Sequence, residues 1–148
     1  MVVVLIISFL ATLAVPAIQR YKLKTKTAVI FSDFRTFAAA FDTYAQEFGV
    51  FPPEAAAGVM PTGMSGRLNG TAWKRQTLMG GRYNWENNQL HFGVRYRAAI
   101  AISATGASPL PLDVAQLVDM DRTKDDGNLL GGSFRIGSAL NPLFVVQP

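Results

Sequence analysis

The residues best suited to chemistry are four carboxylates in the C-terminal third of the chain. Asp119, Asp121, Asp125 and Asp126 fall within the run VDMDRTKDDGNLLGG. Carboxylates this close repel one another unless positive charge neutralises them, and a hard cation such as Ca²⁺ prefers oxygen ligands of this kind. One interpretation is therefore a calcium site formed by these four residues.

A polar turn without a metal is the competing interpretation of the same run. No Glu closes the twelve-residue spacing of an EF-hand loop, and Asp126-Gly127 is a common turn pair. Arg122 and Lys124 supply part of the neutralising charge. Both interpretations stay open, and for carboxylates in such an exposed acidic loop we expect ordinary pKa values.

The sequence contains few residues that could support other catalytic chemistry. His91 is the only histidine and there is no cysteine, so neither a zinc site nor a nucleophilic triad has its residues. We expect His91 at the surface, at the end of a strand. The chain is predicted not to be an enzyme.

The elements that position the acidic run are a short helix and strands. Residues 109–120 favour a helix with Asp113 as N-cap and with Leu112 and Leu117 as a hydrophobic staple. Residues 133–136 and 143–146 are short apolar strand candidates. Residues 83–103 predict a hairpin that turns at Asn87-Asn88. Its apolar face is formed by Phe92, Val94, Tyr96, Ala98, Ile100 and Ile102.

Upstream of the hairpin, residues 50–82 are rich in Gly and Pro, which predicts an irregular connector. A short helix around residues 70–78 is compatible with this, and Trp73 is a candidate to pin the connector to the core. The expected fold class is α+β, with a small antiparallel sheet.

The first third of the chain predicts one long helix, from Met1 to Gly49. Residues 1–18 carry no charge, and a basic collar of Arg20, Lys22, Lys24 and Lys26 follows. An apolar stripe at helical spacing then predicts the face that holds the sheet. The stripe comprises Phe31, Phe34, Ala38, Phe41, Ala45 and Phe48, broadened by Phe37 and Tyr44.

We interpret residues 1–18 as the transmembrane or filament-core part of this helix, because about 20 apolar residues span a bilayer. A signal peptide and a buried core helix are the alternatives, but a signal peptide needs a basic start and terminal helices are rarely apolar all round. The chain has 148 residues, of which 49% are hydrophobic and 16% charged, and its net charge is +4. The collar holds most of that excess, so the charge is weak support for nucleic-acid binding.

The apolar block followed by Ala14-Val15-Pro16-Ala17 and the basic collar resembles the N-terminal segment of type IV pilins and of type II secretion pseudopilins. The family's basic leader, its cleavage-site Gly and the Phe and Glu that follow have no counterpart here. We therefore expect the chain to begin inside the usual mature N-terminus, and the methylation site cannot be assigned. The run from Asp125 to Arg135 also resembles the C-terminal region of major pseudopilins, where that family binds calcium.

The resemblance implies a division into residues 1–26, the helix and collar, and residues 27–148, an α+β head in the periplasm or on an extracellular filament. It implies a structural subunit of a pseudopilus or pilus. Its partners would be other copies of the chain, other pilin-like subunits, the bacterial inner membrane and the assembly machinery. The alternative is a membrane-anchored binding module resembling a minor pilin, which binds DNA through basic residues. Those residues are Arg67, Lys74, Arg75, Arg82, Arg95 and Arg97.

Overall fold

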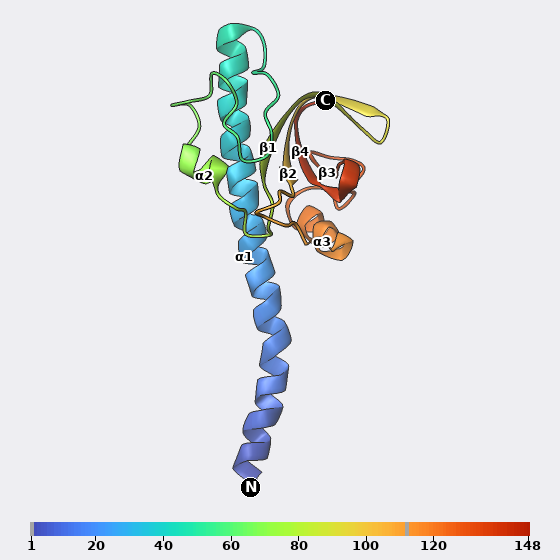
Figure 1. The fold of residues 1–148 in the computed structure, drawn as a ribbon. Helices are drawn as coiled ribbons and strands as arrows, with labels where there is room; N and C mark the ends of the chain where they lie inside the picture. Colours follow the sequence, from blue (N-terminus) through green and yellow to red (C-terminus); the bar gives the residue numbers. More distant parts are fainter. Residues whose placement is uncertain (1, 112) are drawn as a thin grey trace.

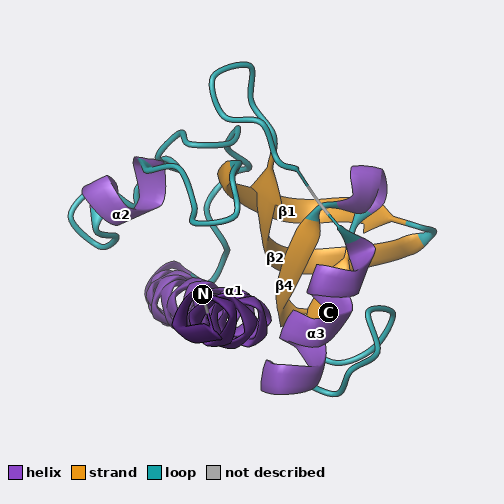
Figure 2. Ribbon diagram, turned by 90° about the horizontal axis from the view of Figure 1, so that it is seen from below, coloured by secondary structure: helices purple, strands orange, loops and turns teal. Residues whose placement is uncertain are grey.

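The structure is a computed structural model that describes residues 2–111 and 113–148, apart from the side chains of residues 11–17, 19 and 20 within the first helix. A long helix, α1 (Val2–Phe48), projects from a small head (Figure 1). The head contains a four-stranded antiparallel sheet, and α1 lies along one face of it (Figure 2). The predicted α+β class, with a long helix on a small antiparallel sheet, is confirmed.

Helix α1 is held to the head by the face that the sequence predicted. Phe31, Phe34 and Phe41 are buried, and the ring of Phe41 stacks on that of Trp85 at a centroid distance of 3.6 Å. The prediction was wrong for Phe48, which is 53% exposed. The ring of Phe48 lies beyond the sheet, beside Tyr44 and beneath the Arg67 guanidinium.

The C-terminal end of α1 is where the sequence placed it. Gly49 has a φ of +74°, and its N–H donates to the carbonyl of Ala45 at 2.8 Å. This left-handed residue closes the helix because glycine has no Cβ to oppose a positive φ.

The N-terminal half of α1 stands clear of the head (Figure 1). Among the described residues, no helix has a stretch both long and apolar enough to cross a membrane, so the predicted transmembrane character of residues 1–18 is not supported there.

The connector between α1 and the sheet is irregular, as predicted, with one short helix, α2 (Gly70–Lys74). Asn69 caps α2 by accepting from the N–H groups of Thr71 and Ala72. Trp73 is fully buried and donates its indole N–H to the carbonyl of Val59 at 2.8 Å. Trp73 therefore pins the connector against α1, as expected.

The hairpin is formed by β1 (Arg82–His91) and β2 (Val94–Ser103), but it does not turn at the predicted position. Its turn is Phe92-Gly93, with φ values of +48° and +82°. A two-residue hairpin turn of type I′ needs positive φ at both positions, and Gly93 adopts it without strain. The expected apolar face was wrong at the tip, since Phe92 and Val94 are exposed.

Two shorter strands complete the sheet in the order β1-β2-β4-β3, which agrees with the predicted strand regions. β4 (Pro142–Gln147) pairs with β2, and β3 (Phe134–Ile136) pairs with β4. A turn of 3₁₀ helix, η1 (Ser138–Leu140), connects β3 to β4.

The remaining helix, α3 (Val114–Lys124), lies at the end of the head nearest the projecting part of α1 (Figure 1). Asp113 is its N-cap, as predicted, and accepts from the Ala115 N–H at 2.9 Å. Leu112, expected in the hydrophobic staple, lies outside the described residues. Helix α3 continues four residues beyond the predicted end at Met120, so Asp121 lies on the helix and not in a loop.

Candidate metal centre

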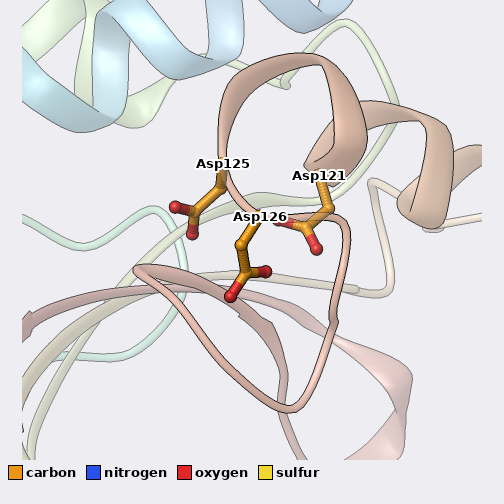
Figure 3. A group of neighbouring side chains, drawn as sticks. All are labelled: Asp121, Asp125 and Asp126. Atoms are coloured by element: carbon orange, nitrogen blue, oxygen red, sulfur yellow. The ribbon is translucent and has the colours of Figure 1, made fainter.

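Three of the four predicted acidic residues come together at the C-terminal end of α3 (Figure 3). Each of Asp121, Asp125 and Asp126 offers a carboxylate oxygen, and these atoms lie within 4.8 Å of one another. Asp121 comes from the last turn of α3, while Asp125 is its C-cap and Asp126 opens the following loop.

Asp119 is the fourth predicted ligand, and it does not belong to this group. It is exposed on α3 and lines a hollow between α3 and α1. Asp119 and Asp121 are two residues apart, so they point to well-separated sides of the helix. The prediction assumed a loop here, in which all four carboxylates converge.

For Asp121, the expectation of an exposed loop residue with an ordinary pKa was wrong. Its side chain is fully buried, and neither carboxylate oxygen has a hydrogen-bond partner. Burial raises the pKa of Asp121 to about 6, and the charges of Asp126 and Asp125 add to the shift. The Gly127 N–H opposes the shift, although its geometry falls short of a hydrogen bond.

The loop after α3 fixes the other two carboxylates. Asp125 Oδ2 accepts from the backbone N–H groups of Ser133 and Phe134, at 2.5 and 2.7 Å. Asp126 Oδ1 accepts from the Asn128 N–H at 2.8 Å. Gly132 permits this closure, because a Cβ there would lie 2.3 Å from Asp125 Oδ2 and its φ is +62°.

The arrangement suits a hard cation. Within the described residues, four carboxylate oxygens of the group make no hydrogen bond: both of Asp121, Oδ1 of Asp125 and Oδ2 of Asp126. A Ca²⁺ ion takes six to eight oxygen ligands, so these atoms would supply about half a coordination shell, with water completing it. The cation would also neutralise the buried Asp121 charge, which forms no ion pair with any described residue.

A second buried polar group was missed by sequence reasoning. His91, expected at the surface, is only 8% exposed, and its Nε2 lies 2.6 Å from Glu86 Oε2. The backbone N–H of Ser138 donates to Nδ1 at 2.9 Å, so the proton of the neutral ring sits on Nε2 and is donated to Glu86. Burial raises the pKa of Glu86, and His91 opposes that rise.

His91 is buried because the segment between β3 and β4 covers it. Gly137 lies so close that a Cβ there would be 2.9 Å from His91 Nδ1. The contact joins residues 46 positions apart in the sequence, so strand periodicity alone could not reveal it. Both ring nitrogens are used within the fold, which supports a structural role for this pair.

Four of the arginines proposed for DNA binding are engaged in contacts within the fold. Arg67 is ion-paired with Glu47 at 2.6 Å and Arg75 with Asp33 at 2.5 Å. Arg82 donates to the Lys74 carbonyl and Arg95 to that of Asn88.

The fold and site thus define an α+β head with a carboxylate cluster, carried on a projecting apolar helix. Comparison with protein-family models, with curated proteins and with solved structures found no match to this chain.

Proposed function

We propose that this chain is a structural subunit that polymerises through its apolar N-terminal helix, as a subunit of a type II secretion pseudopilus or a type IV pilus does. The observation that carries the proposal is the exposed apolar surface of α1. Nine large apolar side chains between Val2 and Ile18 are at least half exposed. They are Val2, Val3, Val4, Leu5, Ile6, Ile7, Phe9, Leu10 and Ile18.

Removing such a surface from water is favourable, because burying each apolar side chain stabilises the protein or assembly by roughly 1.5–3 kcal/mol. A run of consecutive apolar residues covers all sides of a helix, so one partner on one side leaves most of it in water. Several copies packed around each helix bury the whole circumference. The heads then form the outer layer, and repetition of one heterologous contact produces an open polymer.

In this proposal the partners are other copies of the chain and related pilin-like subunits. Lipid of the bacterial inner membrane covers the apolar helix before an assembly machinery inserts the subunit. The head lies in the periplasm or on an extracellular filament, and the chain catalyses no reaction. The carboxylate cluster holds a calcium ion that stabilises the head.

The test is assembly of the full-length chain after removal of detergent, followed by sedimentation and electron microscopy. We expect sedimenting filaments from the natural sequence and none from Leu5→Asp, because a charge in the packed helix layer lacks a partner. Val94→Asp, at an exposed position in the head, is the matched control and should assemble. Absence of filaments from the natural sequence under all assembly conditions would argue against a structural polymer.

A further inference from the structure

A hollow of about 410 Å³ lies between α1 and α3, where the projecting helix enters the head. Its lining includes Lys24 from the basic collar and Arg122 from the last turn of α3. Leu23, Thr27 and Thr123 form the rest of the lining together with Asp119, its one carboxylate. The hydroxyls of Thr27 and Thr123 donate to the carbonyls of Leu23 and Asp119, within their own helices.

The cations around this hollow lack anionic partners. Among the described residues, neither Lys24 nor Arg122 takes part in an ion pair, and the same holds for Lys22, Lys26 and Lys124. All five side chains are exposed. Arg122 and Lys124 thus add two exposed positive charges to those of the collar. Asp119 and the carboxylate cluster of Asp121, Asp125 and Asp126 lie on or next to the same helix, and a cation bound at the cluster would offset its charge.

We propose that this basic region binds the phosphate headgroups of anionic lipids, and that α3 thereby seats the head on the membrane surface before assembly. The inference rests on the proposed function, in which lipid covers the apolar part of α1 in the unassembled subunit. It goes beyond that function by assigning a lipid-recognising role to a head element, α3.

The distribution of the charges favours a lipid surface over a single protein partner. Lys22 and Lys26 are about one helical turn apart, whereas Lys24 points roughly to the opposite side of α1. A helix that enters a membrane end-on is surrounded by the layer of lipid headgroups. Cations on opposite sides of the helix can therefore contact that layer at the same time. These cations also follow the exposed apolar residues between Val2 and Ile18 along α1, which is the order that a membrane interface requires.

Asp119 works against binding of an anion, and this provides a sharp test. It shares the hollow with Lys24 and Arg122 but lies outside the carboxylate cluster. Replacing it by Asn removes repulsion without touching the candidate metal ligands. Lipid binding should therefore become tighter, an effect that damage to the fold would not produce.

The experiment measures co-sedimentation of the full chain with vesicles of phosphatidylcholine, with and without phosphatidylglycerol. We expect tighter binding when phosphatidylglycerol is present. Each basic residue near an anionic surface contributes about a fivefold change in affinity. Lys24→Gln/Arg122→Gln should lose most of the preference for phosphatidylglycerol, Arg95→Gln/Arg97→Gln should keep it, and Asp119→Asn should increase it.

Two results would overturn the inference. One is equal binding of the natural chain to both kinds of vesicle. The other is competition by inorganic phosphate beyond that of chloride at the same ionic strength, which would assign the hollow to a soluble phosphate. Neither result touches the proposed function, because the filament assay contains no lipid and Lys24→Gln/Arg122→Gln should still polymerise in it.

Discussion

At the scale of single residues, Asp121 combines complete burial with two unpartnered carboxylate oxygens. A buried ionised group without a partner costs stability, so the metal-free head carries a local penalty. A cation bound at Asp121, Asp125 and Asp126 would remove this penalty. The same residue thus destabilises the metal-free protein, and with a cation bound it would stabilise the head.

Asp121→Asn should separate these two effects. Without metal, at neutral pH, we expect stabilisation by roughly 1–3 kcal/mol, because an amide carries no charge to bury. The rise in melting temperature on adding calcium should disappear. Calorimetric melting with EGTA and with excess calcium measures both. Asp119→Asn is the control and should respond to calcium like the natural chain; an unchanged calcium response in Asp121→Asn would exclude the cluster as the binding site.

The raised pKa of Asp121 predicts a pH dependence for the metal-free protein. Its folded pKa of about 6 lies above the ordinary value of 3.8, so between these values the folded state holds more protons than the unfolded state. The stability contributed by this group is therefore complete below pH 3.8 and is lost as the pH rises through 6.

Comparison of the natural chain with Asp121→Asn in EGTA, from pH 4 to pH 7, isolates this contribution. We expect the gap in melting temperature between the two proteins to widen in favour of the variant as the pH rises. A gap that stays constant over the range would contradict a raised pKa for Asp121.

The buried Glu86–His91 pair gives a further prediction at this scale. His91→Phe removes the hydrogen bonds to Glu86 and to the Ser138 N–H, and it leaves a buried carboxylate with Asn84 as its remaining donor. We expect a loss of roughly 2–3 kcal/mol in the free energy of unfolding, measured in urea. Adding Glu86→Leu should restore part of that loss; no recovery would mean that the charge of Glu86 is not the cause.

At the scale of elements, α1 holds the head through aromatic packing on its inner face. Phe41 contacts both tryptophans, with ring centroids 3.6 Å from Trp85 and 5.6 Å from Trp73. Phe34 stacks on Phe144 of β4 at 5.3 Å. Successive turns of α1 therefore contact the connector and the sheet, which fixes the helix along the head.

Phe41→Ala should lower the free energy of unfolding by roughly 3–5 kcal/mol, because it removes a fully buried ring and leaves a cavity. Urea unfolding followed by fluorescence of Trp73 and Trp85 reports directly on this contact. Phe48→Ala is the matched control on the same helix and should cost less than about 1 kcal/mol, since its ring is half exposed. Equal losses in the two variants would contradict the assignment of the inner face.

Local patterns were sufficient to predict most elements. The stripe on α1, the capping residues Gly49 and Asp113, and the strand regions depend on neighbours in sequence. The structure confirms them, except for Phe48 at the end of the stripe. The hairpin turn was misplaced because Asn87-Asn88 and Phe92-Gly93 both allow positive φ. Only pairing with the rest of the sheet selects between them.

The site was predictable in its residues but not in its geometry. The density of carboxylates pointed to Asp121, Asp125 and Asp126. Their separation from Asp119 follows from the length of α3, because this helix continues beyond its predicted end at Met120. The burial of His91 depends on the segment between β3 and β4, which returns from far along the chain, and no local pattern carries that information.

At the scale of the whole molecule, the two parts of the chain differ in which residues they expose. The head buries its apolar residues, whereas the N-terminal part of α1, which projects from the head (Figure 1), exposes its own. The exposed Lys22, Lys24 and Lys26 lie between the two parts. An exposed apolar surface of this extent marks an interaction site. Packing of α1 against copies of itself is the central claim, and in the proposed account the exposed cations between the two parts contact lipid headgroups before assembly.

The most direct measurement of that claim is cross-linking within assembled material, since the natural chain has no cysteine to interfere. A single Leu5→Cys variant, oxidised after removal of detergent, should yield disulfide-linked dimers of the full chain, because neighbouring copies bring this position together. A Thr43→Cys variant, exposed on the head-bearing half of α1, serves as the comparison and should yield few. Leu5→Cys protein that stays monomeric while the chain sediments as filaments would contradict packing through the apolar helix.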